Sequence, residues 1–388
     1  MEVIMMRYHN IHVQLLMLSL VSALNGCGNT LEAPLESIER SGVISDKSLS
    51  TVIDDSAVNI YNVSIAQDDN FKAPSMWYYT APLITPEDRE TDRSYAQKDP
   101  SVVFHQGEWH IFMTIKLKDA TRLEYISFKR WEDADTAQRT VLRLADTQYY
   151  AAPQVFFFAP HKKWYLIYQV FIPGKKHLHV SFSTTTDISD PNSWTQAQSI
   201  FRKDAEDLRP QGGLDFWVIC DQKRAYLFFT SLDGKLWRMS TPLNEFPYGF
   251  GQMEIALQAD IFEASHTYRL EGLNKYLTIV EANPDSNRYY KAYIAESLDG
   301  SWAPMADSWG KPFAGEVNVR PARGISRWTD NISHAELIRT GNDQTMPINP
   351  EKLQLVFQGA LQAEKASGNS PVPWRIGILT PVSQGAPE

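Results

Sequence analysis

Cysteine and basic residues are both scarce in this chain. Its 388 residues include two cysteines, Cys27 and Cys220, and their positions show no zinc-like spacing with histidines. Cys220 ends an apolar stretch at 217–220, which predicts a buried, inert thiol. Lysine and arginine total 37 against 46 aspartates and glutamates, so the formal net charge is −9. This argues against a nucleic-acid partner, because phosphate binding needs a basic surface.

The N-terminal apolar run, residues 15–21, is too short to span a bilayer. It follows a weakly basic start and precedes small residues, a pattern that predicts a secretory signal peptide over residues 1–27. Cys27 directly follows Gly26 and resembles the lipobox cysteine of bacterial lipoproteins. That resemblance implies that Cys27 carries lipid, that the protein is an exported cell-envelope lipoprotein, and that it meets the membrane only through this anchor. The alternative is a soluble secreted protein that loses Cys27 with its signal.

Residues 28–70 are rich in Ser, Asp, Asn and Thr and poor in aromatic residues. This composition predicts a polar tether or N-terminal arm. Compact structure is expected to begin at Phe71, so that residues 71–388 form one domain. Hydrophobic residues make up 43% of the chain and aromatic residues 12%, which is enough for a sizeable core. The length is unusual for one ordinary domain but normal for a closed repeat architecture.

Long amphipathic helices are missing, and short strands with polar turns recur instead. Five hairpins are expected: 102–104 with 109–113, 154–158 with 164–168, 217–220 with 226–229, 262 through a turn at 270–272 to 276–280, and 332–337 with 353–357. Aromatic residues open the second strand of four of these units, about one propeller blade apart. The pattern predicts an all-β, five-bladed β-propeller. A jelly-roll sandwich is the alternative, but it does not explain so regular a repeat.

Three carboxylates stand at or beside apolar strand starts in separate repeats: Asp99, Asp215 and Glu263. The inner strands of all blades surround one centre, so residues distant in sequence can meet there. Hydrolysis of a glycosidic bond needs two carboxyl groups on opposite sides of the anomeric carbon, one protonated and one ionised. Taken singly, each residue is more often an ordinary turn carboxylate; the repeated placement favours a shared site.

Ordered sequence stretches across about residues 71–381 resemble glycoside hydrolase family 62, a relative of the family 43 propellers. The matching stretches are 98–103, 151–156, 158–160, 187–192, 217–221, 257–265, 287–289, 312–315, 330–339, 341–345 and 373–375. The resemblance implies an inverting α-L-arabinofuranosidase. Such an enzyme releases arabinofuranosyl side groups from plant arabinoxylan, with arabinan as a further polymer.

The resemblance also implies roles for the three carboxylates. Asp99 matches the general base that activates water, and Glu263 matches the general acid. Asp215 matches a third carboxylate that holds the sugar and raises the pKa of the acid. Because an inverting enzyme needs room for a water, Asp99 and Glu263 are expected to stand roughly 6.5–9.5 Å apart.

Further positions receive binding roles from the same match. Lys98, Gln154 and Tyr289 are expected to bind sugar hydroxyls. His334 is expected to support a structural Ca²⁺ ion near the site, the alternative being an ordinary hydrogen-bonded strand histidine. No organic cofactor and a monomeric enzyme are expected.

Alternatives to this function remain open on sequence grounds. A family-43-type β-xylosidase or endo-arabinanase would use the same fold, and pocket shape rather than sequence distinguishes these activities. A surface lipoprotein that only binds glycans is the alternative from another class, although pure binding needs no protonated acid. The Tyr-Asn pair that many family members carry before Pro373 is missing here, so the preferred polysaccharide backbone is left open.

Overall fold

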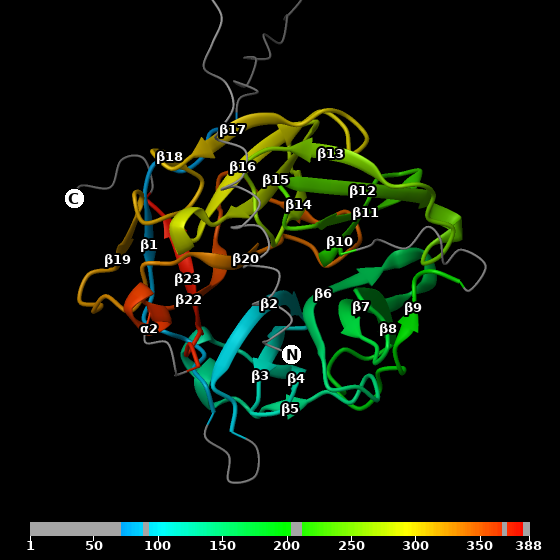
Figure 1. The fold of residues 1–388 in the computed structure, drawn as a ribbon, viewed down its shortest axis with the longest axis horizontal. Helices are drawn as coiled ribbons and strands as arrows, with labels where there is room; N and C mark the ends of the chain where they lie inside the picture. The colour runs from blue at the N-terminus through cyan, green and yellow to red at the C-terminus, as the bar shows by residue number, and fades with distance from the viewer. Residues whose placement is uncertain (1–70, 88–92, 203–211, 367–370, 383–388) are drawn as a thin grey trace, which may run out of the picture. The chain divides into compact units, whose positions relative to one another are not determined.

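Five β-sheets surround a common centre in the computed structural model (Figure 1). The structure describes residues 71–87, 93–202, 212–366 and 371–382, all within one compact unit. This arrangement confirms the all-β, five-bladed propeller and excludes the two-sheet jelly roll. The predicted signal peptide with Cys27 and the predicted tether 28–70 lie outside the described residues.

Three blades are antiparallel meanders of four strands each. Blade 1 contains β2 (Ala96–His105), β3 (Glu108–Lys116), β4 (Thr121–Phe128) and β5 (Thr140–Val141). Blade 2 contains β6 (Tyr150–Phe158), β7 (Lys163–Phe171), β8 (Leu178–Thr185) and β9 (Gln198–Ser199). Blade 3 contains β10 (Leu214–Cys220), β11 (Arg224–Thr230), β12 (Lys235–Pro242) and β13 (Glu254–Gln258).

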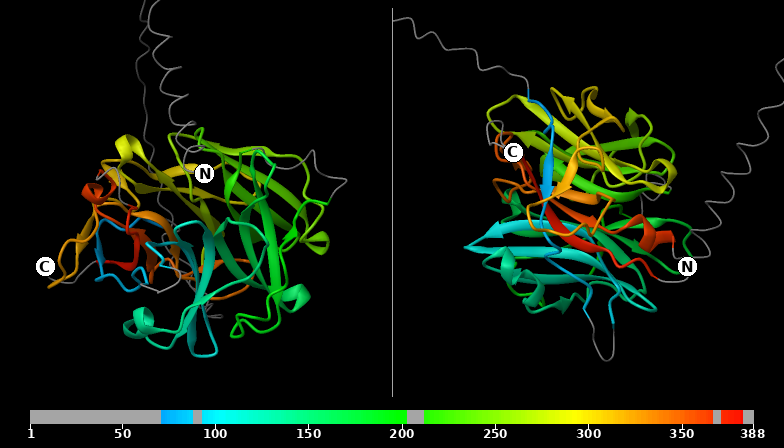
Figure 2. Two further views of the ribbon diagram at one scale, coloured as in Figure 1. Left: turned by 60° about the horizontal axis from the view of Figure 1, so that its bottom comes forward. Right: turned by 90° about the vertical axis from the view of Figure 1, so that its left-hand side faces the viewer.

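The other two blades include strands that come from elsewhere in the sequence. Blade 4 contains β14 (His266–Leu270), β15 (Lys275–Ala282), β16 (Tyr289–Ala295), β17 (Ala303–Ser308) and β18 (Lys311–Pro312), and β21 (Pro347–Ile348) joins it. Blade 5 contains β20 (Ser333–Leu337), β22 (Leu355–Gly359), β23 (Arg375–Pro381), β1 (Trp77–Tyr79) and β19 (Val319–Pro321). The first strand, β1, pairs antiparallel with the last, β23, so the two ends of the domain close the ring together (Figure 2).

Among the described residues, the helical elements are short and lie in the connections. They are α2 (Gln362–Ala366) and the 3₁₀ turns η1 (Trp131–Thr136), η2 (Ala159–His161), η4 (Leu243–Glu245) and η5 (Pro284–Ser286).

All five predicted hairpins are present, with one boundary corrected. Strand β14 begins at His266 rather than at Phe262. Ala264 has a φ of 54°, a left-handed conformation that interrupts the extended chain. Glu263 therefore lies in the segment that leads into β14, where its carbonyl oxygen accepts a hydrogen bond from the Glu281 amide at 2.9 Å.

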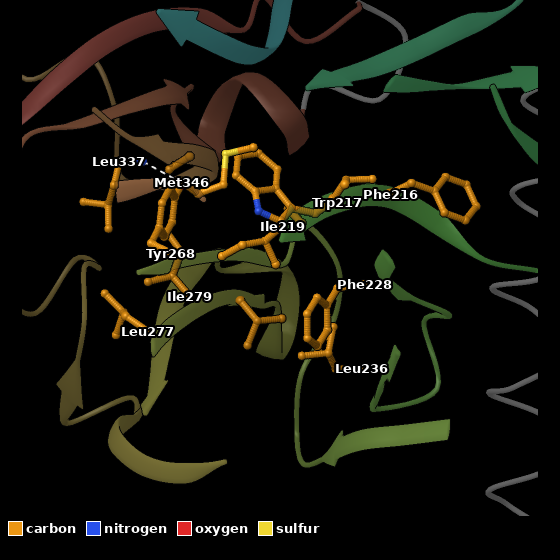
Figure 3. Close-up of a cluster of buried hydrophobic side chains, with 14 of the residues drawn as sticks. Phe216, Trp217, Ile219, Phe228, Leu236, Tyr268, Leu277, Ile279, Leu337 and Met346 are labelled. Carbon is orange, nitrogen blue, oxygen red and sulfur yellow. Dashed lines mark hydrogen bonds between the residues drawn. The ribbon is translucent and has the colours of Figure 1, made fainter. Parts of the chain in front are cut away.

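Apolar side chains fill the space between neighbouring blades. Figure 3 shows part of this core, where β10 and β11 face β14 and β15. The Trp217 ring lies edge-on to Tyr268, with 5.6 Å between the ring centroids, and the Tyr268 hydroxyl accepts a hydrogen bond from the Leu337 amide of blade 5. Cys220 belongs to the same core and is 1% exposed, as predicted. Burial raises the pKa of its thiol well above the ordinary value, so it remains a neutral packing residue.

Each inner strand is distorted at the same place. Five residues other than glycine adopt positive φ values of 34–54° within the first four residues of an inner strand or just before it: Asp99, Ala152, Asp215, Ala264 and His334. In four of the five blades the pairing register shifts there, as in a β-bulge. Such a backbone conformation costs of order 1–3 kcal/mol per residue and re-aims the side chain. Because the distortion recurs in every blade, we infer that it serves to aim the side chains at these five positions.

The other end of the propeller centre is crossed by the segment after β20. Main-chain oxygens of Asn342, Gln344 and Met346 accept hydrogen bonds from residues of blades 2, 3 and 4 respectively, at 2.7–3.0 Å. The buried guanidinium of Arg339 donates to the carbonyl oxygens of Val102 and Val155, each at 2.9 Å. This crossing segment covers the ends of the inner strands. A ligand can therefore reach the centre only from the side where those strands begin.

Candidate active site

The distorted positions bring the predicted residues together. Asp99 of blade 1, Asp215 of blade 3 and His334 of blade 5 each occupy one of them. The Nδ1 atom of His334 lies 3.2 Å from Oδ1 of Asp99 and 4.0 Å from Oδ2 of Asp215. Oδ2 of Asp215 in turn accepts a hydrogen bond from the amide of Ala264, the residue after Glu263, at 2.9 Å. The three carboxylates that stand far apart in sequence therefore meet at one end of the propeller.

A ring of hydrogen bonds holds these distorted positions. In four blades, the amide of the distorted residue donates to a side chain from the second strand of the preceding blade. The four bonds are Asp99 to Gln358, Ala152 to Thr114, Asp215 to Gln169, and His334 to Glu281, at 2.7–2.9 Å. The fifth junction, between blades 3 and 4, differs. The matching residue of β11 is Thr230, whose buried hydroxyl makes no hydrogen bond within the structure. The amide of the distorted residue Ala264 donates to Asp215 instead. The departure from the repeat falls at a predicted catalytic residue.

Lys98 and His334 lie beside the carboxylate of Asp99. Its carboxylate is 3.5 Å from the ammonium of Lys98, whose side chain is 26% exposed. Burial alone would raise the pKa of Asp99, but Lys98, His334 and the Thr114 hydroxyl outweigh it, so the pKa lies below the ordinary value. The pKa of Lys98 is itself raised, because Asp99 and the other carboxylates outweigh the effect of its burial. Asp99 is therefore an ionised carboxylate, as a general base must be.

Asp215 lies in the opposite electrostatic situation. Burial and the negative charges of Glu263 and Asp99 raise its pKa well above the ordinary value, although the Ala264 amide opposes this. The site thus contains one carboxyl group whose pKa is lowered and one whose pKa is raised by its surroundings.

Glu263 is held by an arginine that the sequence analysis did not select. One nitrogen of the Arg288 guanidinium, Nη1, lies 2.6 Å from Oε1 of Glu263 and 2.7 Å from Oε1 of Glu281. The guanidinium also stacks near the rings of Phe262 and Trp374, at 5.1 and 5.7 Å from their centroids. Glu263 is 17% exposed at the side chain, which leaves it accessible to a ligand.

The structure corrects the expectation for Gln154. Its side chain is 1% exposed, and its amide exchanges two hydrogen bonds of 2.7 Å with the main chain of Val218 in blade 3. Similar inter-blade bonds join Trp217 to Thr267 and His266 to Ala335. Gln154 therefore ties blade 2 to blade 3 rather than offering its amide to a sugar.

Tyr289 is likewise placed away from the carboxylates. Its ring packs edge-on against Trp309 at 5.2 Å and near the ammonium of Lys291. Burial and the nearby Asp260 and Asp307 raise its pKa to about 12. The preceding residue, Arg288, is the one that reaches the site.

The residues around His334 do not fit a calcium ion held directly by the protein. Burial lowers the pKa of His334, although Asp99 opposes this, and its Nδ1 atom lies 3.2 Å from Oδ1 of Asp99. Calcium takes six to eight oxygen ligands. Within the described parts of the chain, no three His, Cys, Asp or Glu side chains are grouped to hold a metal.

Comparison with known proteins points to one family. The sequence model of glycosyl hydrolase family 62 matches residues 77–380. Alpha-L-arabinofuranosidase C of Cellvibrio japonicus is 37% identical over 321 residues, which is 81% of this chain and 48% of that protein. The chain therefore spans about half the length of this curated relative.

Two solved structures are also similar. The catalytic domain of a Coprinopsis cinerea family 62 α-L-arabinofuranosidase is 37% identical with a TM-score of 0.72, and the match covers 80% of this chain and 98% of that one. A family 62 hydrolase crystallised with xylotriose is 32% identical with a TM-score of 0.70, covering 81% and 100%.

Proposed function

Because this chain belongs to glycosyl hydrolase family 62, we propose that it is an α-L-arabinofuranosidase that removes side groups from arabinoxylan with inversion of configuration. The observation that carries the proposal is the meeting of Asp99, Asp215 and Glu263 from separate blades at the open ends of the inner strands. The relatives support the substrate class, since one is an arabinofuranosidase and another was crystallised with xylotriose.

The proposed chemistry assigns one task to each carboxyl group. Asp99, kept ionised by Lys98 and His334, accepts a proton from the attacking water. Glu263 donates a proton to the departing xylose oxygen; Arg288 holds its Oε1 atom, so that Oε2 can carry this proton. Asp215 binds the sugar through its carboxyl group. The separation of Asp99 and Glu263 expected for inversion, roughly 6.5–9.5 Å, remains a prediction.

Sugar release from three polymers tests this function. The purified protein is incubated with wheat arabinoxylan, unsubstituted xylan and linear arabinan, and the products are separated by chromatography. We expect arabinose from arabinoxylan and little release from the other two. Xylose from xylan, or short oligosaccharides from arabinan, would instead support the β-xylosidase or endo-arabinanase alternative. Binding to arabinoxylan without release would support the glycan-binding alternative.

The charge of Lys98 predicts a particular pH dependence. Asp99 works only when ionised, and Lys98 helps to hold its pKa below the ordinary value, so the acidic limb of kcat/KM should lie at low pH in the wild type. Lys98→Met removes the positive charge, raises the pKa of Asp99 and should move the acidic limb upward by about one pH unit or more. Lys98→Arg keeps the charge and serves as the control. An acidic limb that stays in place in Lys98→Met would contradict the role given to Lys98.

We propose further that the enzyme is exported and anchored to the cell envelope through lipid on Cys27. The described residues contain no helix long and apolar enough to cross a membrane. Support for the anchor comes from the sequence at 15–27, and the polar segment 28–70 would let the catalytic domain reach polymers beyond the membrane.

Cell fractionation tests the anchor. Wild-type activity is expected in the membrane fraction and Cys27→Ser activity in the soluble fraction, because several acyl chains anchor a protein firmly. Both forms should have the same kcat, since the catalytic residues are unchanged. Wild-type activity that is wholly soluble would favour the secreted alternative.

A further inference from the structure

Glu281 occupies one of the repeated positions that hold the distorted inner strands. It lies on the second strand of blade 4, and its Oε2 atom accepts the amide of His334 in blade 5 at 2.9 Å. The matching positions of blades 2 and 5 are filled by Gln169 and Gln358, which accept the corresponding amides with neutral carboxamide oxygens. The fold therefore requires only a hydrogen-bond acceptor here. A neutral glutamine would satisfy this need at position 281 as well, so the negative charge of Glu281 must have another function.

The explanation lies in what the second carboxylate oxygen contacts. Oε1 of Glu281 accepts a hydrogen bond from Nη1 of Arg288 at 2.7 Å, and the same Nη1 donates to Glu263 at 2.6 Å. The side chain of Glu281 is fully buried, whereas that of Arg288 is 19% exposed. The main chain of Glu281 also pairs with the segment that carries the acid. Its carbonyl oxygen accepts a hydrogen bond from the Phe262 amide at 2.7 Å, and its amide donates to the Glu263 carbonyl oxygen at 2.9 Å. Glu281 thus fixes both the backbone that carries Glu263 and the cation that holds its carboxyl group.

A further set of hydrogen bonds connects Glu281 to the base. The Ser333 hydroxyl donates to Oε2 of Glu281 at 2.9 Å and accepts from the Gln358 carboxamide at 3.0 Å. Gln358 in turn accepts the Asp99 amide at 2.7 Å. The buried carboxylate of Glu281 is therefore linked by hydrogen bonds both to Arg288 beside the acid Glu263 and to the backbone of the base Asp99.

We propose that Glu281 is a positioning residue for catalysis, whose carboxylate holds Arg288 against Glu263 and so orients the acid toward the leaving oxygen. This inference rests on the proposed function, because it assigns Glu263 as the acid. A buried charge is costly unless it is paired, and Arg288 supplies that pairing. Burial raises the pKa of Glu281 to about 6, although Arg288 opposes the rise, so the charge that holds the arginine is present above that pH.

Glu281→Gln separates the structural role from the positioning role. Glutamine can still accept the His334 amide, as Gln169 and Gln358 do in their blades, but it cannot form an ion pair with Arg288. We expect the variant to fold and to lose about 10-fold or more in kcat on an arabinoxylan oligosaccharide, whose leaving group needs a proton. On 2,4-dinitrophenyl α-L-arabinofuranoside, whose leaving group needs none, kcat should change by less than about threefold.

Glu124→Gln is the matched control. Glu124 is also a buried glutamate near an arginine: its Oε2 atom lies 3.9 Å from Arg139 and accepts a hydrogen bond from Gln97 of blade 1 at 3.1 Å. Its replacement should affect both substrates equally, whatever it does to the melting temperature. Equal losses on the two substrates in Glu281→Gln would overturn the proposal and assign Glu281 to stability alone.

Two further measurements keep the proposal testable if Glu281→Gln folds poorly or turnover is low. Arg288→Gln should show the same dependence on the leaving group, and in combination with Glu281→Gln the losses should not add. Additive losses would overturn the proposal.

Crystal structures of the wild type and of Glu281→Gln test the geometry without any need for turnover. The contact between Arg288 and Glu263 should be present in the wild type and lost in Glu281→Gln. An unchanged contact would overturn the inference; a wild type that releases no arabinose would contradict the proposed function instead.

Discussion

Glu263→Gln should remove nearly all release of arabinose from arabinoxylan. An amide has no acidic proton to give to the departing xylose oxygen, and general acid catalysis is worth about 10²–10⁴-fold in rate. The fold should survive, because the side chain is partly exposed and its main-chain bond to Glu281 does not depend on the carboxyl group. Initial rates on arabinoxylan, with the melting temperature measured in parallel, check both expectations.

The leaving group again supplies the sharpest control. On 2,4-dinitrophenyl α-L-arabinofuranoside, Glu263→Gln should retain far more activity than on arabinoxylan, because this substrate departs without protonation. A variant that keeps more than about half of the wild-type rate on arabinoxylan would refute the acid assignment, since the expected loss is about a hundredfold or more.

Asp99→Asn should lose turnover on every substrate, whatever its leaving group. The change removes the group that accepts the proton of water, and we expect a loss of about 10²–10⁴-fold. Sugar binding should be largely kept, because asparagine has nearly the same shape and retains hydrogen-bonding atoms. Calorimetric titration with an arabinoxylan oligosaccharide checks binding, and rates on the oligosaccharide and the dinitrophenyl substrate check turnover.

The two variants are therefore expected to differ in pattern. Asp99→Asn should affect both substrates alike, whereas Glu263→Gln should spare the activated one. A large loss for Asp99→Asn on arabinoxylan alone would mean that Asp99, not Glu263, assists the leaving group, and the two assignments would be reversed.

The propeller was predictable because its signals are local. Apolar runs of strand length, each followed by a polar turn and an aromatic residue such as Trp109 or Trp164, recur at blade spacing. The start of β14 was misplaced because Ala264 bends the chain without a glycine, proline or asparagine to announce it. The other distortions have partial signals, since proline follows Asp99 and Ala152 and glycine precedes Asp215 by two residues, but nothing in the sequence shows that they share one place in the repeat.

The candidate site was predicted only in part. Asp99, Asp215 and Glu263 were found because carboxylates beside apolar strands are conspicuous, and they do converge. Gln154 was assigned to the sugar because its bond to Val218 comes from the next blade, a partnership that no local pattern reveals. Arg288 was passed over for its neighbour Tyr289, since sequence does not show which of two adjacent turn residues faces the centre.

Glu281 had a signal that was available. It follows the apolar residues Ile279 and Val280 inside a strand, and an acidic residue in such a run usually has a buried partner. Reacting carboxylates were predicted at strand starts, whereas Glu281 stands near a strand end. In an antiparallel blade the end of the second strand lies beside the beginning of the first, so carboxylates at both places can reach the same site.

Proton NMR of the arabinose first released from wheat arabinoxylan tests the central claim most directly. The account predicts that arabinose appears and that the β-anomer forms first, because Asp99 directs water to the face opposite the leaving xylose oxygen. The α-anomer then grows in by mutarotation. Initial appearance of the α-anomer would show retention and contradict the role of Asp99 as a simple base, and the absence of arabinose would contradict the proposed activity itself.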